Sequence, residues 1–171
     1  IEYLNYESER ESDIMEGVKK KIYQPIERRE VAVSMRHITE DNFKLSNIML
    51  LNFNYTTTPE LYMDGSSKVT INYIHGCLND SNSVIFGYGD ELDKEFSRLK
   101  ELTNNECLRY VKSINYLEAD NYRKLLEFVE TEPFQVIVMG HSCGNSDRTL
   151  LNTIFEHPNC VSIKPYYYIN E

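Results

Sequence analysis

The sequence predicts an α/β fold with a mostly parallel sheet and flanking helices. Short apolar, β-branched runs alternate along the chain with amphipathic segments of helical periodicity. Each strand-like run ends in a polar or glycine-containing turn. Hydrophobic residues make up 41% of the 171 residues and charged residues 26%, so the chain is globular and long enough to bury a core.

The first element is charge-rich. Apolar residues at Ile14, Val18 and Ile22 follow i, i+4 spacing and predict one amphipathic helix over residues 8–30, interrupted near Pro25. The chain begins without methionine, so we expect the C-terminal portion of a longer protein. In this interpretation residues 1–171 form a single α/β domain. Residues 46–171 are its core, and residues 1–45 are a helical segment that leads into that core.

Three apolar runs predict the main strands. Residues 48–53, 69–74 and 134–139 each stop at a candidate site residue, and we expect them to be parallel neighbours in one sheet. Two further strands are predicted at 83–86 and at 161–168, where Pro165 favours a sheet edge.

Helices are predicted between these strands. A short helical segment follows Pro59 at residues 60–62, and longer periodic patterns cover 92–113 and 120–131. Ser146 is the candidate N-cap of a helix that runs to Phe155.

Composition excludes several classes of function. The net charge of −9 argues against a surface that binds duplex nucleic acid. The four cysteines show no Cys-x-x-Cys spacing, and no acidic cluster accompanies the histidines, so no metal site is expected. No signal peptide or membrane span is visible, which favours free thiols, a cytoplasmic location and no membrane partner.

The stretch Gly140-His141-Ser142-Cys143-Gly144 follows a predicted strand and precedes a predicted helix. It matches the Gly-x-Ser-x-Gly nucleophile elbow of serine hydrolases, with Ser142 as the nucleophile. The acidic and histidine partners available downstream lie on or beside the elbow's own helix, which points away from the serine. Glycines that shape a ligand-binding turn are therefore the favoured interpretation.

Parallel strands place their carboxyl ends at one edge of the sheet, where nucleotides commonly bind. Asn54, His75 and the 140–142 turn would converge at this edge. An asparagine can hold a ribose hydroxyl or orient a water, and a histidine can act as a base. Gly76 would leave room for close approach of a ligand. A lone histidine at a strand end is more often structural, but neighbouring polar strand ends beside a glycine turn also favour a binding site.

Four short blocks, in this order and spacing, resemble the signature blocks of the AbiH-type bacteriophage abortive-infection proteins from about residue 46 onward. They are Phe53-Asn54-Tyr55-Thr56, Ile74-His75-Gly76, Gly87-Tyr88-Gly89-Asp90 and Gly140-His141-Ser142 with Asp147. The resemblance implies a distant relation to sirtuin-like domains, which are Rossmann-like, three-layer and NAD-binding. Such proteins begin with a strand and a glycine-rich phosphate loop, which has no counterpart here before residue 47.

The resemblance also implies roles for individual residues. Asn54 matches an asparagine that positions water or ribose, and His75 matches a catalytic histidine. The expected nucleotide-binding residues are Phe53, Tyr55, Gly76, Gly87, Gly89, Gly140, His141, Ser142 and Asp147.

Two functional hypotheses follow from the resemblance, and the sequence does not separate them. The first is a cytoplasmic antiviral effector that hydrolyses NAD to nicotinamide and ADP-ribose without a metal. The second is a non-catalytic sensor in which the same pocket binds a nucleotide and controls homo-oligomerisation. The serine hydrolase that uses Ser142 is the third and least favoured hypothesis.

Overall fold

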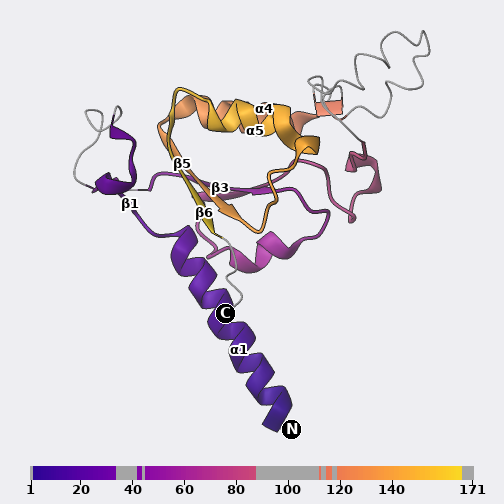
Figure 1. Ribbon diagram of the computed structural model, residues 1–171. Coiled ribbons are helices and arrows are strands. Elements are labelled where there is room, and N and C mark those ends of the chain that lie inside the picture. The colour runs from indigo at the N-terminus through magenta and orange to yellow at the C-terminus, as the bar shows by residue number, and fades with distance from the viewer. Residues whose placement is uncertain are drawn as a thin grey trace. The chain divides into compact units, whose positions relative to one another are not determined.

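The computed structural model describes residues 2–33, 42–43, 45–87, 112, 115–116 and 119–166 (Figure 1). The chain divides into two units. The first comprises residues 1–50 and 56–71, and the second comprises 51–55 and 72–171. The predicted helix over 92–113 and the residues Gly89 and Asp90 lie outside the described ranges, apart from position 112.

The first unit begins with helix α1, Glu2–Ile22. The predicted helix over 8–30 was therefore wrong in its end point, which lies before Pro25. Proline disfavours helical backbone in the residue before it, so the helix stops short of Gln24. Lys19, Lys20 and Lys21 occupy the last turn, where positive charge complements the helix dipole. Strand β1 (Ile26–Glu27) follows and pairs antiparallel with β2 (Asn42–Phe43).

Two short 3₁₀ helices in the described part of the first unit bear on its packing: one follows β1, and the other lies between residues 48–52 and 69–73. The first, η1, covers Arg28–Glu30 and has a capping box between Glu27 and Glu30. The second, η3, covers Thr58–Tyr62, where a short helical segment was predicted, and it has proline in its first turn. The Tyr23 hydroxyl donates to the Tyr62 carbonyl at 3.1 Å, which ties the end of α1 to η3.

Strands β3 (Ile48–Asn52) and β4 (Val69–Tyr73) pair with each other, and each passes from the first unit into the second. Ile48 N donates to Lys68 O at their starts, and Ile74 N donates to Asn52 O at their ends. Because both bonds join residues in the same chain order, the strands are parallel, as predicted. Their carboxyl ends therefore lie together in the second unit.

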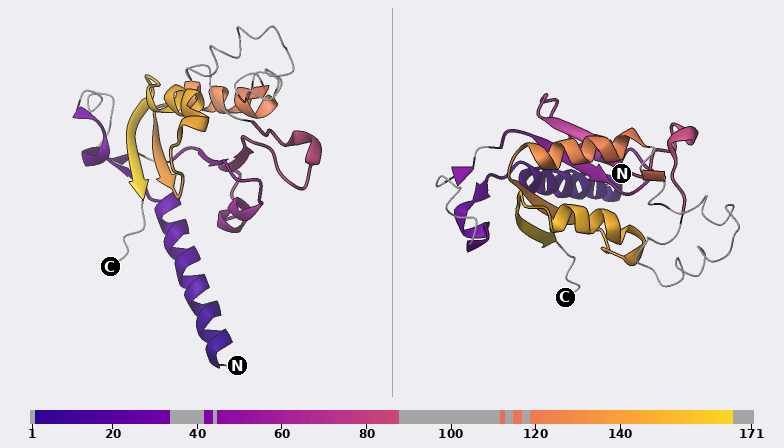
Figure 2. Two further views of the ribbon diagram at one scale, coloured as in Figure 1. Left: turned by 45° about the vertical axis from the view of Figure 1, so that its right-hand side comes forward. Right: turned by 90° about the horizontal axis from the view of Figure 1, so that it is seen from above.

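The second unit contains a strand–helix–strand crossover. Strand β5 (Phe134–Met139) lies parallel to β6 (Cys160–Tyr166), and helix α5 (Arg148–Phe155) connects them. Figure 2, left, shows the two arrows side by side and pointing the same way. Helix α4 (Asp120–Thr131) precedes β5. Buried apolar side chains of α4, α5 and β6 form the core of this unit: Leu125, Val129, Leu150, Leu151, Ile154 and Val161.

The α/β prediction with parallel strands is confirmed, but three details differ. In the described residues the strands are hydrogen-bonded as the pairs β3–β4 and β5–β6, not as three neighbours of one sheet. The predicted strand at 83–86 is wrong, because η4 (Ser81–Ser83) ends a tight turn there. The Ser83 hydroxyl closes this turn by accepting from Cys77 N at 3.0 Å and donating to Asp80 O at 2.7 Å.

The third difference lies at the start of α5. Ser146 was predicted as its N-cap, but Asn145–Asp147 form a 3₁₀ turn, η6, and Asp147 is the N-cap residue of α5. The Ser146 hydroxyl donates to the Asp147 carboxylate at 2.9 Å instead of capping a backbone N–H. Asp147 is thereby held at the point where β5 leads into α5.

Candidate functional site

Aromatic rings from three strand ends meet within the second unit. Phe53 directly follows β3, His75 lies two residues after β4, and His141 lies two residues after β5. The Phe53 ring contacts His75 edge-on, with centroids 5.5 Å apart, and His141 in a tilted geometry at 4.1 Å. The structure thus brings together the predicted residues of three separate sequence blocks.

His75 is buried, with 4% of its surface exposed. Its Nδ1 lies 2.9 Å from the Phe53 carbonyl oxygen, which can only accept, so Nδ1 carries a proton. Its Nε2 lies 2.7 Å from the Tyr116 hydroxyl and 3.1 Å from Asp147 Oδ1. Neutral His75 accepts from Tyr116 at Nε2, and protonated His75 donates to Asp147. Each protonation state therefore has a partner.

Asp147 is the hub of the cluster. Its Oδ1 accepts from Lys112 Nζ at 3.1 Å and faces His75. The Tyr116 hydroxyl lies 3.4 Å from Oδ1 and donates its one proton there when His75 is protonated. Its Oδ2 accepts from Ser146 at 2.9 Å. Burial raises the pKa of the Asp147 carboxyl, but hydrogen bonds from His75, Lys112 and Ser146 and the Lys112 charge outweigh burial and hold that pKa well below its usual range. Asp147 is therefore ionised at neutral pH.

Lys112 and Tyr116 are site residues that the sequence analysis missed. Both are buried, and both contact Asp147. The Tyr116 ring stacks on His75 at 5.9 Å and on Tyr122 at 6.0 Å. Burial and the Asp147 charge raise the pKa of the Tyr116 hydroxyl, which keeps it a donor. Their i, i+4 spacing is the signal that could have placed both side chains on one helix face.

The turn after β5 holds His141 in a defined tautomer. Gly140 has φ +68° and Cys143 φ +51°, both in the left-handed region. Cys143 N donates to His141 Nδ1 at 2.9 Å, so neutral His141 carries its proton on Nε2, 3.8 Å from Asp147 Oδ2. Burial lowers the pKa of His141, and His75 and Lys112 add to this effect against the Asp147 charge. His141 is therefore neutral near pH 7.

The remaining predicted residues are placed as follows. Asn54 is exposed, and among the described residues its hydrogen bond runs from its backbone N to Asn52 Oδ1 at 3.1 Å rather than to His75. Tyr55 lies 6.2 Å from His75 between ring centroids and donates its hydroxyl to Ile85 O at 3.2 Å. Ser142 is exposed, and Gly87 is half-buried.

Gly76 has a structural explanation. Its φ of +81° is in the left-handed region, and a Cβ at this position would overlap the Ser83 carbonyl. The space beside Gly76 is thus filled by the turn that Ser83 closes, rather than left for a ligand. Glycine at this position lets the backbone turn away after β4 while the Ser83 carbonyl packs against it.

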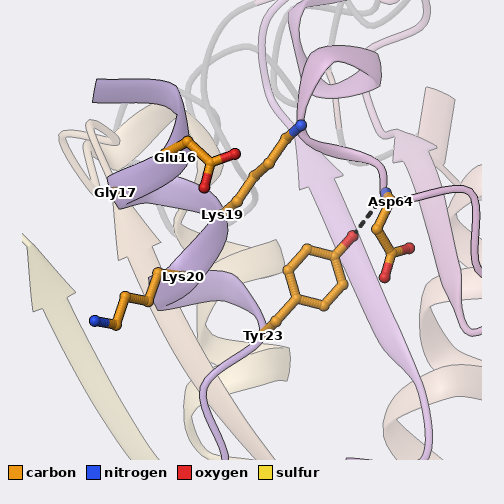
Figure 3. A pocket seen from close by; sticks show the side chains of 6 residues that line it. All are labelled: Glu16, Gly17, Lys19, Lys20, Tyr23 and Asp64. Carbon is orange, nitrogen blue, oxygen red and sulfur yellow. Dashed lines mark hydrogen bonds between the residues drawn. The ribbon is translucent and has the colours of Figure 1, made fainter. Parts of the chain in front are cut away.

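A separate hollow of about 430 Å³ lies wholly within the first unit (Figure 3). It is lined by Glu16, Gly17, Lys19, Lys20, Tyr23 and Asp64. The Tyr23 hydroxyl accepts from Asp64 N at 3.1 Å, in addition to its bond with Tyr62. The phenol is therefore engaged in joining α1 to the η3 segment, and none of the residues around His75 lines this hollow.

Three further findings concern the part of the chain that the structure describes. Within it, no group of three or more His, Cys, Asp and Glu side chains is arranged to hold a metal ion. None of its helices combines the length and the apolar character that crossing a bilayer requires. Cys77, Cys143 and Cys160 are free thiols.

Comparison with known proteins identifies the family. No curated protein and no solved structure matches the chain significantly. The sequence model of the family described as "Bacteriophage abortive infection AbiH" matches residues 1–168. The chain therefore belongs to the AbiH family of bacteriophage abortive-infection proteins and takes part in defence against phage.

Proposed function

We propose that the cluster around His75 is a nucleotide site and that the protein hydrolyses NAD at the nicotinamide–ribose bond during phage defence. One observation carries the proposal. Phe53, His75, His141 and Asp147 come from four separate segments and meet where β3, β4 and β5 end. The carboxyl ends of parallel strands are the usual place for a nucleotide in an α/β fold.

The reaction needs little chemical assistance. Nicotinamide in NAD is a positively charged leaving group, so positioning, a water and a base are sufficient. Water attacks the ribose C1′, the C1′–N bond breaks with its electron pair going to nicotinamide, and the water proton passes to the base. The products are nicotinamide, ADP-ribose and a proton.

His75 is the proposed base and Asn54 the residue that orients the water. Because Nδ1 of His75 already carries a proton, Nε2 is the nitrogen that takes a proton from water. It does so after exchanging the Tyr116 hydroxyl, 2.7 Å away, for that water. Asn54 is exposed, so its amide is free to meet a ligand. Of the remaining predicted residues, His141 and Ser142 in the turn after β5 would contact the nucleotide.

The burial of His75 favours a second candidate function. Its side chain is 5% exposed, and both its nitrogens have protein partners, as expected for a structural histidine. In this alternative the site binds a nucleotide without cleaving it, and binding controls homo-oligomerisation. The fold and the site residues are the same in both cases, so only turnover separates them.

The test measures nicotinamide release from NAD by full-length protein and by its His75→Ala and Asn54→Ala variants. Loss of a positioned base costs roughly 100- to 10,000-fold in rate, so we expect release and phage protection to disappear in both variants. His157→Ala is the matched control, because His157 packs on Phe134, away from the cluster.

Binding without turnover would support the sensor. NAD would then raise the melting temperature of the wild-type protein and change its oligomeric state while no nicotinamide appears. Wild-type turnover in well-folded samples of both variants would remove Asn54 and His75 from the mechanism.

A further inference from the structure

We propose that Asp147 is a positioning residue, which fixes the orientation and the proton distribution of His75 and His141 and does not itself bind the nucleotide. The catalytic part of this inference rests on the function proposed above. The structural part stands on the contacts of the Asp147 carboxylate, which join the segment after β4 to the turn after β5.

Protein groups use up the acceptor capacity of the Asp147 carboxylate. A carboxylate offers about four lone-pair positions. Around Asp147, Oδ1 faces His75, Lys112 and Tyr116, while Oδ2 faces Ser146 and His141. The side chain is 9% exposed. Protein groups thus occupy the positions that a ribose hydroxyl would need.

The two histidines approach the Asp147 carboxylate in opposite tautomers. His75 has its proton on Nδ1, fixed by the Phe53 carbonyl, and presents Nε2 to Asp147. His141 accepts at Nδ1 from Cys143 N and presents an Nε2 proton to the other oxygen. The Asp147 carboxylate therefore lies between His75, whose Nε2 can take up a proton, and His141, whose Nε2 already carries one.

Lys112 supplies the positive charge that balances the Asp147 carboxylate. Lys112 Nζ lies 3.1 Å from Asp147 Oδ1, and both side chains are buried. A buried carboxylate without a counter-charge would take up a proton and lose its hold on both rings. Lys112 keeps the carboxylate ionised. The lysine therefore acts on the histidines through Asp147.

The kinetic test uses Asp147→Asn in the full-length protein, with Asp120→Asn as the control. Asp120 is an exposed carboxylate paired with Arg123, so its variant loses a charge without touching the site. We expect Asp147→Asn to lower kcat roughly 10-fold or more, because removing a carboxylate that orients a histidine costs at least that much, with an unchanged KM for NAD. A raised KM with unchanged kcat would overturn the proposal, because Asp147 would then be binding the nucleotide.

The second measurement does not require activity. The chain has four histidines, so their imidazole nitrogen chemical shifts can be assigned with single substitutions. Asp147→Asn is expected to change the shifts of His75 and His141 but not those of His157. Tyr116→Phe, which removes one hydroxyl next to His75, is expected to change His75 alone. Unchanged His75 and His141 shifts in folded Asp147→Asn would overturn the proposal.

The kinetic and the chemical-shift measurements test the proposed hydrolysis and the proposed role of Asp147 separately. If the wild-type protein releases no nicotinamide, the proposed hydrolysis fails, while the chemical shifts still decide the role of Asp147. If Asp147→Asn does not fold, the same shifts are measured in Asp147→Asn with Lys112→Met, since removing both buried charges avoids a stranded cation. In that variant the same changes at both histidines are expected, and their absence counts against the proposal.

Discussion

His75 Nε2 lies 3.1 Å from Asp147 Oδ1, so the segment that ends β4 and the residue that begins α5 meet at one contact. The histidine would have been unremarkable as an isolated strand-end residue. Around it lie the Asp147 carboxylate, the Tyr116 phenol and the buried Lys112, which are hydrogen-bonded to one another in one network. Such a network is costly to break and stable when every member is paired.

The first prediction separates folding from chemistry. His75→Ala leaves the Phe53 carbonyl, the Tyr116 hydroxyl and Asp147 short of a partner, so we expect the free energy of unfolding to fall by at least about 2 kcal/mol. Asn54 is exposed, so Asn54→Ala should stay within about 0.5 kcal/mol of wild type. Urea unfolding followed by circular dichroism measures both. Equal losses in the two variants would contradict the structure.

The second prediction uses two glycines with similar backbone angles. A Cβ at Gly76 would overlap the Ser83 carbonyl, whereas a Cβ at Gly140 meets nothing within 4 Å. Gly140→Ala should therefore cost only the left-handed backbone penalty, about 1–2 kcal/mol. Gly76→Ala should cost clearly more, because the 77–83 turn must move. Thermal melts of the two variants side by side check the order, and the reverse order would be incompatible with this turn.

The third prediction concerns pH. Because the pKa of Asp147 is lowered in the folded state, its ionised form contributes stability that is present above the unfolded value of about 3.9. That stability is lost as the pH falls from there through the folded pKa. Near pH 7, Asp147→Asn should cost roughly 3–5 kcal/mol, because Lys112 loses its buried partner. The gap between wild type and variant should narrow below about pH 4 in urea unfolding series. A gap that widens on acidification would show that Asp147 is not the ionised hub.

The fourth prediction addresses Ser142. Its hydroxyl is exposed, and in the described residues no hydrogen bond joins it to a histidine, since His75 pairs with Asp147 and His141 accepts from Cys143. A serine without a base is a weak nucleophile. Fluorophosphonate probes should therefore label wild type and Ser142→Ala at background level alike. Strong labelling of wild type that Ser142→Ala abolishes would restore the hydrolase hypothesis.

The elements that sequence predicted well are those with local determinants. Strand β5 has the predicted bounds because Pro133 and Gly140 flank an unbroken apolar run. Helix α4 also has its predicted bounds, 120–131, because its apolar side chains repeat at helical spacing. The 83–86 run failed for the opposite reason. Its β-branched and aromatic side chains suit a strand, but the Ser83 hydroxyl completes a turn with Cys77 and Asp80.

The site was predictable only in part. Topology predicted only that His75 would lie near the 140–142 turn, which contains His141. The resemblance to the AbiH family added Phe53 and Asp147. Lys112 lies in the segment 92–113, which was read only for its helical periodicity, and Tyr116 lies between the two predicted helices. Nothing local to either residue indicates a partner at Asp147. Buried ion pairs between residues far apart in the chain have no characteristic spacing that a sequence pattern could reveal. The exposure of Asn54 likewise depends on the surrounding fold and not on its neighbours.

The end of β4 also bears on how this chain behaves at high concentration. In the β3–β4 ladder the Lys68 carbonyl and the Ile74 N–H face β3, so the intervening odd-numbered Tyr73 presents its carbonyl to the opposite edge. That carbonyl accepts from Gly76 N at 2.9 Å and from Asn121 Nδ2 at 2.7 Å. Asn72 Nδ2 in turn donates to Asn121 O at 2.8 Å. Free strand edges are where separate chains add strands and aggregate, and at Tyr73 no acceptor is left for an incoming strand.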